Sequence, residues 1–439
     1  MPTQKLTSLA RALCALGLTI GLAACGSDTS TDNQAFSVAV IGDLPYGFAA
    51  ANNSGVVDNA QFLAIPAFFK FISDDKDLAM VFHGGDIHSG KEYCTEAFNK
   101  SVLEQLRALA LPIVYTPGDN EWADCHKKKQ GGGLFNTTTS VIDYVKDATG
   151  ALASYAGGDP LANLALVRSL FFPAPGKTLG VAMDVTSQAK AFDPAYPSDS
   201  QYVENVRFKK GNVVFVTLNI PGGSNNDTDA WYYPIGSGTR TPQQDLEVAN
   251  RTAANLRWLK AAFAQANAEG ASAVAILVQG DMWDPDNTDL AAGRAHITQL
   301  KTFIDEIASS AKTFTKPVLL MNGDSHVYRS DNPLVLGADC YKEPIAIVGG
   351  VDQTTGAIAT KAACADVPGR NVYGTDASLN QAGSYSVPNF HRIVWHGSTL
   401  PFEYIKLRVD PSVNAAYSFN PSTGAEAFGP FSWTRVVKK

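Results

Sequence analysis

Five aspartates in this chain each follow a short apolar run, and together they could hold metal ions. They are Asp43, Asp86, Asp119, Asp281 and Asp324, and a histidine, His326, follows the last of them. Carboxylates within a few ångströms of one another cannot all ionise without cations, because each negative charge raises the pKa of its neighbours. Oxygen-rich clusters with a histidine at the edge suit divalent cations. The pattern predicts a metal site if these side chains converge.

Each aspartate has a simpler explanation when it is taken alone. An aspartate after a strand often caps a helix or closes an Asx-turn. The recurrence of one pattern, an apolar run followed by Gly-Asp, is harder to explain in this way.

The apolar runs are predicted to be strands that carry the aspartates at their carboxyl ends, where open α/β sheets place their chemistry. The predicted strands are 36–41, 78–82, 113–115, 274–278 and 318–321. The segment Pro112–Trp122 shows the design most clearly, because Pro117-Gly118 ends the strand and presents Asp119, Asn120 and Glu121 in the loop.

Helical patterns separate these strands, as in a right-handed parallel sheet. The predicted helices are 57–72, one capped by Thr95, 242–268 and one that carries Ile297 to Ile307. Residues 125–200 are predicted to be an insertion that contains a short helix at 161–172. Strands at 345–348, 392–395 and 404–409 predict a second, more antiparallel sheet.

The N-terminus predicts export and lipid anchoring. Lys5 and Arg11 precede an apolar stretch, residues 12–22, that is too short for a permanent transmembrane helix. Leu22-Ala23-Ala24-Cys25 resembles the lipobox of bacterial lipoproteins, which implies a signal peptide at 1–24, a lipid on Cys25 and a tether at 25–35. An ordinary signal peptide with an incidental cysteine is the alternative. Gly26 favours the outer membrane, facing the periplasm, over inner-membrane retention.

The remaining cysteines suit an oxidising compartment. Cys94, Cys125, Cys340 and Cys364 form an even set, which predicts two disulfides. Pairing of sequence neighbours, Cys94 with Cys125 and Cys340 with Cys364, is preferred among three possible connectivities. No Cys-x-x-Cys spacing supports metal ligation by these residues.

Charge and length limit the function classes. The chain has 35 Lys and Arg against 42 Asp and Glu, and loss of Lys5 and Arg11 with the leader brings the net charge from −7 to −9. Nucleic-acid binding is not expected, because phosphate backbones need a basic surface. Residues 36–439 show no linker and no repeat, so one domain is predicted.

The order of these motifs along the chain resembles that of the calcineurin-like metallophosphoesterases. The motifs that match in order are Gly42-Asp43, Gly85-Asp86, Gly118-Asp119-Asn120-Glu121, Val278-Gln279-Gly280-Asp281 and Gly323-Asp324-Ser325-His326. The resemblance implies a four-layer α/β/β/α sandwich, two metal ions at the strand ends and hydrolysis of a phosphoester. The combination of Gly-Asp-Asn-Glu-Trp with Gly-Asp-Ser-His is similar to a bacterial branch of that superfamily.

The chain departs from the family pattern at several ligand positions. Pro45 stands where the first motif has a histidine, and Asp119 stands where the family has an asparagine ligand. Asn120 replaces the histidine that helps to protonate the leaving oxygen, while Asp281 and Asp324 replace metal-binding histidines. His83 or His88 could supply the missing imidazole, although a strand-end histidine more often hydrogen-bonds to the backbone.

The resulting hypothesis is an envelope-anchored phosphoesterase for a small phosphorylated substrate. Asp86 would bridge two cations, with Asp43 and His326 on one and Asp119, Asp281 and Asp324 on the other, while Asn120 and His326 would serve catalysis. Oxygen ligands favour Mg, Mn or Ca over Zn or Fe. Cations for the phosphate would come from among Lys127, Lys128, Lys129 and Arg329. The alternative is a binding lipoprotein with weak or no catalysis.

Overall fold

A computed structural model describes most of the chain. The described residues are 33–47, 59–226, 229–234, 236–283, 290–335, 338–342, 347–349, 351–352, 362–363, 385–397 and 399–439. The proposed leader, lipidation site and tether up to residue 32 therefore lie outside them. Within the described residues, no helix is long and apolar enough to cross a membrane.

The first of two large sheets is built around three parallel strands from the start of the chain. These are β1 (Phe36–Ile41), β2 (Leu78–His83) and β3 (Pro112–Tyr115). Antiparallel strands from the C-terminus continue the sheet beyond β1, namely β18 (Glu403–Val409), β21 (Phe431–Val437), β20 (Ala425–Gly429) and β19 (Ala415–Asn420). The two-residue β6 (Leu179–Gly180) closes the other edge, beside β3.

The second large sheet has four parallel strands at its centre. They are β9 (Val213–Thr217), β10 (Ala273–Leu277), β11 (Val318–Asn322) and β17 (Phe390–Val394). One edge is completed by β8 (Val206–Lys210) and β7 (Thr186–Ser187), and the other by β12 (Arg329–Asp331), β13 (Asp339–Lys342) and β16 (Ala362–Ala363). A separate small pair is formed by β14 (Ile347–Val348) and β15 (Val351–Asp352).

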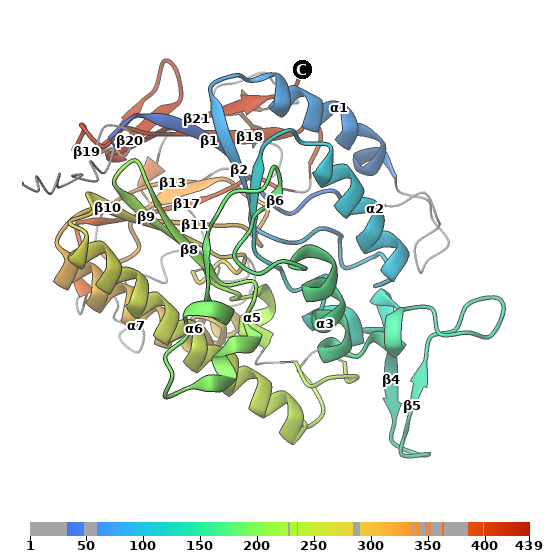
Figure 1. Ribbon diagram of the computed structural model, residues 1–439. Coiled ribbons are helices and arrows are strands. Elements are labelled where there is room, and N and C mark those ends of the chain that lie inside the picture. The colour runs from blue at the N-terminus through green and yellow to red at the C-terminus, as the bar shows by residue number, and fades with distance from the viewer. Residues whose placement is uncertain are drawn as a thin grey trace, which may run out of the picture.

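Helices cover the outer face of each sheet (Figure 1). The first sheet carries α1 (Ala60–Asp74), α2 (Glu96–Arg107) and α3 (Pro160–Phe171), and the second carries α6 (Pro242–Ala268) and α7 (Leu290–Phe314). Three buried apolar clusters fill the spaces between the layers, and the middle one joins side chains of both sheets, such as Phe82 and Phe215. The fold is therefore a four-layer α/β/β/α sandwich, as predicted.

Several local predictions are confirmed in detail. The α6 helix has the predicted bounds, and the Thr95 hydroxyl accepts a hydrogen bond from Phe98 N at 3.1 Å, so it caps α2. The predicted C-terminal antiparallel sheet is wrong. β17 extends the second sheet in parallel, whereas β18 pairs antiparallel with β1 in the first. Both strands bury apolar side chains in the core between the sheets, so each can face that core from a different sheet.

The predicted insertion at 125–200 is largely part of the sandwich. β6 and β7 extend the two sheets, and Val167 and Phe171 of α3 pack in the outer core of the first sheet. The hairpin of β4 (Gly133–Asn136) and β5 (Val141–Tyr144) instead projects from the body (Figure 1). The remaining short elements are α4 (Gln188–Ala191), α5 (Gly222–Asn226), η1 (Ala123–His126), η2 (Lys128–Gln130), η3 (Tyr155–Gly158) and η4 (Pro197–Gln201).

Candidate metal centre

The predicted site residues come together from both sheets. Asp43, Asp86 and Asp119 follow β1, β2 and β3 of the first sheet, while Asp324 and His326 follow β11 of the second. Asp43, Asp86, Asp324 and His326 have left-handed backbone conformations, with φ of 52°, 54°, 73° and 57°. Non-glycine residues seldom adopt this conformation outside sites that require it. The backbone therefore turns sharply at each strand end.

The side chains form two groups that share one member. Ligand atoms of Asp43, Asp86 and His326 lie within 4.8 Å of one another, and so do those of Asp86, Asp119 and Asp324. The Asp86 carboxylate is common to both groups, which is the position predicted for a ligand that bridges two cations. The first group offers one imidazole nitrogen and the second offers oxygen alone.

The carboxylates of Asp86 and Asp119 are buried beside other carboxylates of the cluster. Burial, followed by the charges of Asp119 and Asp43, raises the pKa of Asp86 well above its ordinary value. Burial and the neighbouring Asp124 raise the pKa of Asp119 to about 7. Bound cations would reverse both effects, because a nearby positive charge favours the ionised carboxylate.

The Asp281 carboxylate is in neither group of ligand atoms, and its predicted role as a metal ligand is not supported. Its Oδ1 accepts a hydrogen bond from Arg392 Nη1 at 2.5 Å, and its Oδ2 accepts one from Ser325 Oγ at 2.9 Å and from Arg329 Nη1 at 3.2 Å. Burial would raise the pKa of Asp281, but Arg392 and Arg329 outweigh it and lower the pKa. The carboxylate holds Ser325, between Asp324 and His326, and so supports the site from behind.

Asn120 and Glu121 shape the loop after β3. Asn120 donates hydrogen bonds to both oxygens of Asp86, from its backbone N at 3.2 Å and from its Nδ2 at 2.8 Å. The buried Glu121 carboxylate accepts bonds from Tyr115 Oη and Gly118 N, both at 2.7 Å. Asn120 therefore positions the shared ligand, whereas Glu121 fixes the loop.

An indole ring forms the floor of the site and explains three of the glycines. Trp395 is buried, and its Nε1 donates to Asp43 Oδ2 at 2.5 Å. A Cβ atom added to Gly42, Gly84 or Gly323 would lie 2.5, 1.9 or 2.4 Å from an atom of that ring. No side chain fits at those distances, so these positions need glycine for reasons of space.

Two polar residues that sequence reasoning missed also face the cluster. The Tyr46 hydroxyl lies 2.9 Å from His326 Nε2 and 3.3 Å from Asp86 Oδ2, and burial raises the pKa of this phenol. The buried Gln279 amide nitrogen lies 3.3 Å from Asp324 Oδ1 and 3.5 Å from Asp119 Oδ1. Tyr46 follows Pro45, and Gln279 lies two residues before Asp281. Closeness to these motif positions was the signal in the sequence that could have pointed to Tyr46 and Gln279.

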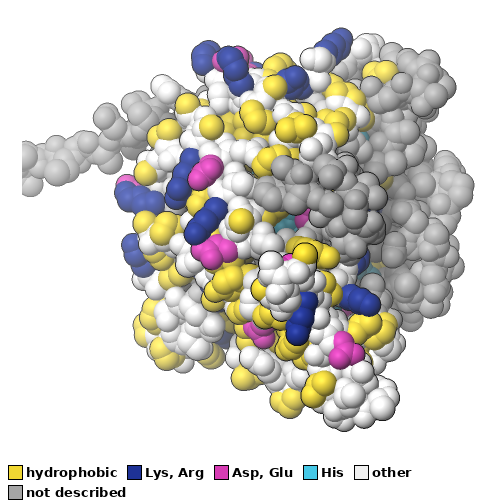
Figure 2. All heavy atoms as spheres, turned by 90° about the vertical axis from the view of Figure 1, so that its right-hand side faces the viewer, with side chains coloured by type: hydrophobic (Ala, Val, Ile, Leu, Met, Phe, Trp, Pro, Cys, Tyr) yellow, Lys and Arg dark blue, Asp and Glu magenta, His cyan; other side chains and the backbone are white. Residues whose placement is uncertain are grey.

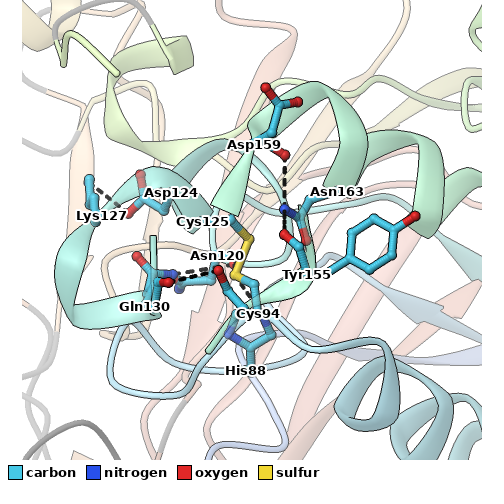
Figure 3. The surroundings of a disulfide bond; sticks show 12 residues. His88, Cys94, Asn120, Asp124, Cys125, Lys127, Gln130, Tyr155, Asp159 and Asn163 are labelled. Atoms are coloured by element: carbon cyan, nitrogen blue, oxygen red, sulfur yellow. Dashed lines mark hydrogen bonds and ion pairs between the residues drawn. A yellow bond between two sulfur atoms is a disulfide. The ribbon is translucent and has the colours of Figure 1, made fainter. Parts of the chain in front are cut away.

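The two histidines near Asp86 do not complete the site. Gly85 N donates to His83 Nδ1 at 3.2 Å, and His83 Nε2 lies 3.0 Å from Leu44 O, so both ring nitrogens serve the backbone. Burial lowers the pKa of His83 to about 4, which keeps the ring neutral. His88 instead lies beside the Cys94–Cys125 disulfide, whose predicted pairing is confirmed (Figure 3). The predicted Cys340–Cys364 disulfide lies outside the residues whose side chains the structure describes.

The four candidate phosphate-binding cations differ in their surroundings. Lys127 Nζ pairs with Asp124 at 2.7 Å and Asp229 at 3.2 Å, and Arg329 pairs with Asp281. Lys128 and Lys129 are exposed. A Cβ atom on Gly90 would lie 3.2 Å from Lys129 Nζ and 3.4 Å from Asn120 Oδ1, which places this ammonium group beside the site loop.

Charged side chains elsewhere do not suggest a polyanion surface on the face that Figure 2 shows. The described Lys and Arg side chains there are interspersed with Asp and Glu.

The donor set fits divalent cations. Four carboxylates, three of them buried, and one imidazole converge in two overlapping groups, and the ionised cluster is stable only with positive charge nearby. In chemical terms, the residues can hold two cations with Asp86 between them.

Comparison with known proteins gives one family. Residues 36–227 match the family described as calcineurin-like phosphoesterase, a range that contains Asp43, Asp86, Asp119 and Asn120. A search of curated proteins gave no match.

Proposed function

Residues 36–227 belong to the calcineurin-like phosphoesterases, a family of metal-dependent hydrolases, and from that premise we propose that this chain hydrolyses small phosphomonoesters or phosphodiesters at the Asp86 cluster. The observation that supports this best is the shared position of Asp86 in two groups of ligand atoms. In this proposal Asp43, Asp86 and His326 hold one cation, and Asp86, Asp119 and Asp324 hold the other.

The cations, when bound, would activate water as a nucleophile and offset charge on the phosphoryl group. The protein's own residues set the geometry. Trp395 Nε1 and Asn120 fix the carboxylates of Asp43 and Asp86 through the hydrogen bonds described above. The Tyr46 hydroxyl lies between Asp86 and His326, and in this proposal it would donate a hydrogen bond to a phosphoryl oxygen of the bound substrate. Asn120 cannot donate a catalytic proton as the family's histidine does.

Among the basic side chains, Lys129 is proposed to bind the phosphate of the substrate at the exposed edge of the site. It is exposed and lies beside Asn120, whereas Lys127 is largely enclosed by Asp124 and Asp229. Lys129→Gln should raise KM by about tenfold with little change in kcat, because a rim charge contributes mainly to substrate binding. Lys128→Gln, at the neighbouring exposed position, is the matched control.

The proposed cations are Mg, Mn or Ca, because the group of Asp86, Asp119 and Asp324 offers only carboxylate oxygen. Metal analysis of protein purified without chelators tests this. Stoichiometric zinc with no response of activity to Mg, Mn or Ca would contradict it.

Activity itself is tested on a panel of phosphomonoesters and diesters, with chelator-treated protein resupplied with each metal. Wild type should turn over at least one substrate, Asp86→Ala should not, and Asp184→Asn, which changes an exposed aspartate in the β6–β7 region, should match wild type. Wild-type turnover no greater than that of Asp86→Ala with every metal would instead support the alternative, a lipoprotein that binds through this fold without catalysis.

The cellular location is a separate proposal that depends on Cys25. We expect the mature protein to be lipid-anchored in the outer membrane, facing the periplasm. Incorporation of labelled fatty acid should be lost in Cys25→Ser, and equal labelling of both proteins would rule out this anchor.

A further inference from the structure

A second cluster of metal-ligating side chains contacts the backbone of Asn120, the residue that hydrogen-bonds to Asp86 in the carboxylate site. It consists of His88, Cys94 and Cys125, all buried, with ligand atoms within 4.8 Å of one another (Figure 3). The two sulfurs are joined as a disulfide between the loop after β2 and the η1 turn after β3. While that bond exists, the sulfurs are poor metal ligands, since thiolates bind metals.

Three of the six distances among these atoms and the Asn120 carbonyl oxygen already match a tetrahedral zinc site, and the two sulfurs must separate from 2.03 Å to complete it. With Zn–S of about 2.3 Å and Zn–N or Zn–O of about 2.1 Å, tetrahedral ligand atoms lie about 3.5 to 3.8 Å apart. His88 Nε2 lies 3.7 Å from Cys94 Sγ. The carbonyl oxygen of Asn120 lies 3.4 Å from Cys94 Sγ and 3.5 Å from Cys125 Sγ. Three edges of the tetrahedron therefore exist before any metal binds.

The histidine is also held in the orientation that a metal requires. His88 Nδ1 lies 3.1 Å from Ser89 O, a carbonyl that can only accept a hydrogen bond, so Nδ1 carries the proton. Nε2 is then the unprotonated nitrogen, and it faces Cys94 Sγ. Metal-bound histidines usually donate their other N–H to a carbonyl or carboxylate in this way.

From these contacts we propose that the chain contains a reduction-dependent zinc site made of Cys94, Cys125, His88 and the Asn120 carbonyl. A thiol or phosphine reductant supplies two electrons to break the S–S bond, and each sulfur takes up one proton. Binding of a soft divalent cation such as Zn²⁺ then releases those two protons as the thiolates coordinate it. The site has sulfur and nitrogen ligands, so it differs in metal preference from the oxygen-rich Asp86 cluster.

The test uses the mature protein, reduced with a phosphine and desalted without oxygen, and titrated with Co²⁺ as a spectroscopic probe. Reduced wild type should show a sulfur-to-cobalt charge-transfer band at one Co²⁺ per chain, and Zn²⁺ should displace it. The oxidised protein should show no band. Co²⁺ in the carboxylate cluster cannot produce this signal, because that cluster contains no sulfur.

Two variants separate this site from other thiols. Cys94→Ser/Cys125→Ser retains every other cysteine and should lose the band. His88→Ala retains both thiols, and its zinc affinity should fall by at least about tenfold. His126→Ala is the matched control, since His126 is also buried but contacts Tyr232 N rather than sulfur.

Three results would overturn the proposal. They are a band that persists in the double cysteine variant, an unchanged zinc affinity in His88→Ala, and a reduced wild type that binds no Zn²⁺. If reduction unfolds the protein, Zn²⁺ should restore the near-ultraviolet circular dichroism, because a metal that binds only the folded form favours folding. Failure of Zn²⁺ to do so would equally contradict the site.

Discussion

Asp281 and Asp86 follow strands with the same Gly-Asp pattern, yet their surroundings are opposite. Both are buried. Two guanidinium groups neutralise Asp281 and lower its pKa, whereas other carboxylates surround Asp86 and raise its pKa. The comparison shows how to recognise a metal ligand among similar aspartates. A buried carboxylate that already has its counter-charge supports the fold, and one that lacks it needs a cation.

The largest expected effect is on catalysis when Asp86 is changed. Asp86→Asn removes the carboxylate shared by both ligand groups, so we expect kcat/KM to fall by at least about 1000-fold, a loss larger than that for one positioned hydrogen-bond donor. The metal-free variant should unfold at the same or a higher denaturant concentration than metal-free wild type, because a buried repulsive charge is gone. A clear loss of metal-free stability would mean that Asp86 resembles Asp281 after all.

The converse variant, Asp281→Asn, should damage the fold more than the metal content. It removes one carboxylate partner from each of the buried guanidinium groups of Arg329 and Arg392. Breaking a buried ion pair costs about 3–5 kcal/mol in the free energy of unfolding. Urea denaturation measures this cost, and metal analysis of the folded fraction should find the wild-type stoichiometry. A loss of bound metal with an unchanged free energy of unfolding would instead show that Asp281 is a metal ligand.

The two environments should also respond oppositely to pH in chelator-treated protein. Asp119, with a pKa of about 7, and Asp86 bind protons more tightly in the folded than in the unfolded chain. Their contribution to stability is full below the unfolded value near 3.8 and is lost as the pH rises towards 7, by up to about 1.4 kcal/mol per pH unit for each group.

Asp281 works in the other direction, since its pKa is lowered on folding. Its contribution is present above the unfolded value and is lost as the pH falls through the lowered pKa. Urea midpoints measured from pH 2 to 8, with and without Mg²⁺, would test both signs. Asp86→Asn should reduce the loss of stability between pH 4 and 7, and a wild-type midpoint that rises over this range without metal would contradict the comparison.

The smallest expected effect concerns the floor of the site. Trp395→Phe keeps an aromatic ring above the three glycines but removes the hydrogen bond from Nε1 to Asp43 Oδ2. Loss of an outer partner of a metal ligand typically lowers activity or metal affinity by about 10–100-fold, and we expect the lower end here. Trp433→Phe is a matched control, because its indole nitrogen bonds Tyr328 in the core between the sheets. Equal activity of the two variants would show that the hydrogen bond from Trp395 to Asp43 does not contribute to activity.

The sequence by itself determined the elements and most of the site. Apolar runs, caps and turns act locally, so the strands before Asp43, Asp86 and Asp119, the Thr95 cap and the bounds of α6 could be predicted from neighbouring residues. The repeated Gly-Asp pattern identified all five aspartates, four of which converge, and the resemblance of the ordered motifs then implied the sandwich.

Only the tertiary structure decided which aspartates meet and what each one faces. The Asp281 carboxylate is paired with Arg392, a residue more than a hundred positions away along the chain. Tyr46 and Trp395 lie in the site although neither belongs to a recognised motif, and Gln279 belongs to a motif in which only Asp281 was expected to be a ligand. The physical reason is that a carboxylate's pKa and its need for a cation depend on burial and on charges a few ångströms away, and those neighbours come from strands of two different sheets.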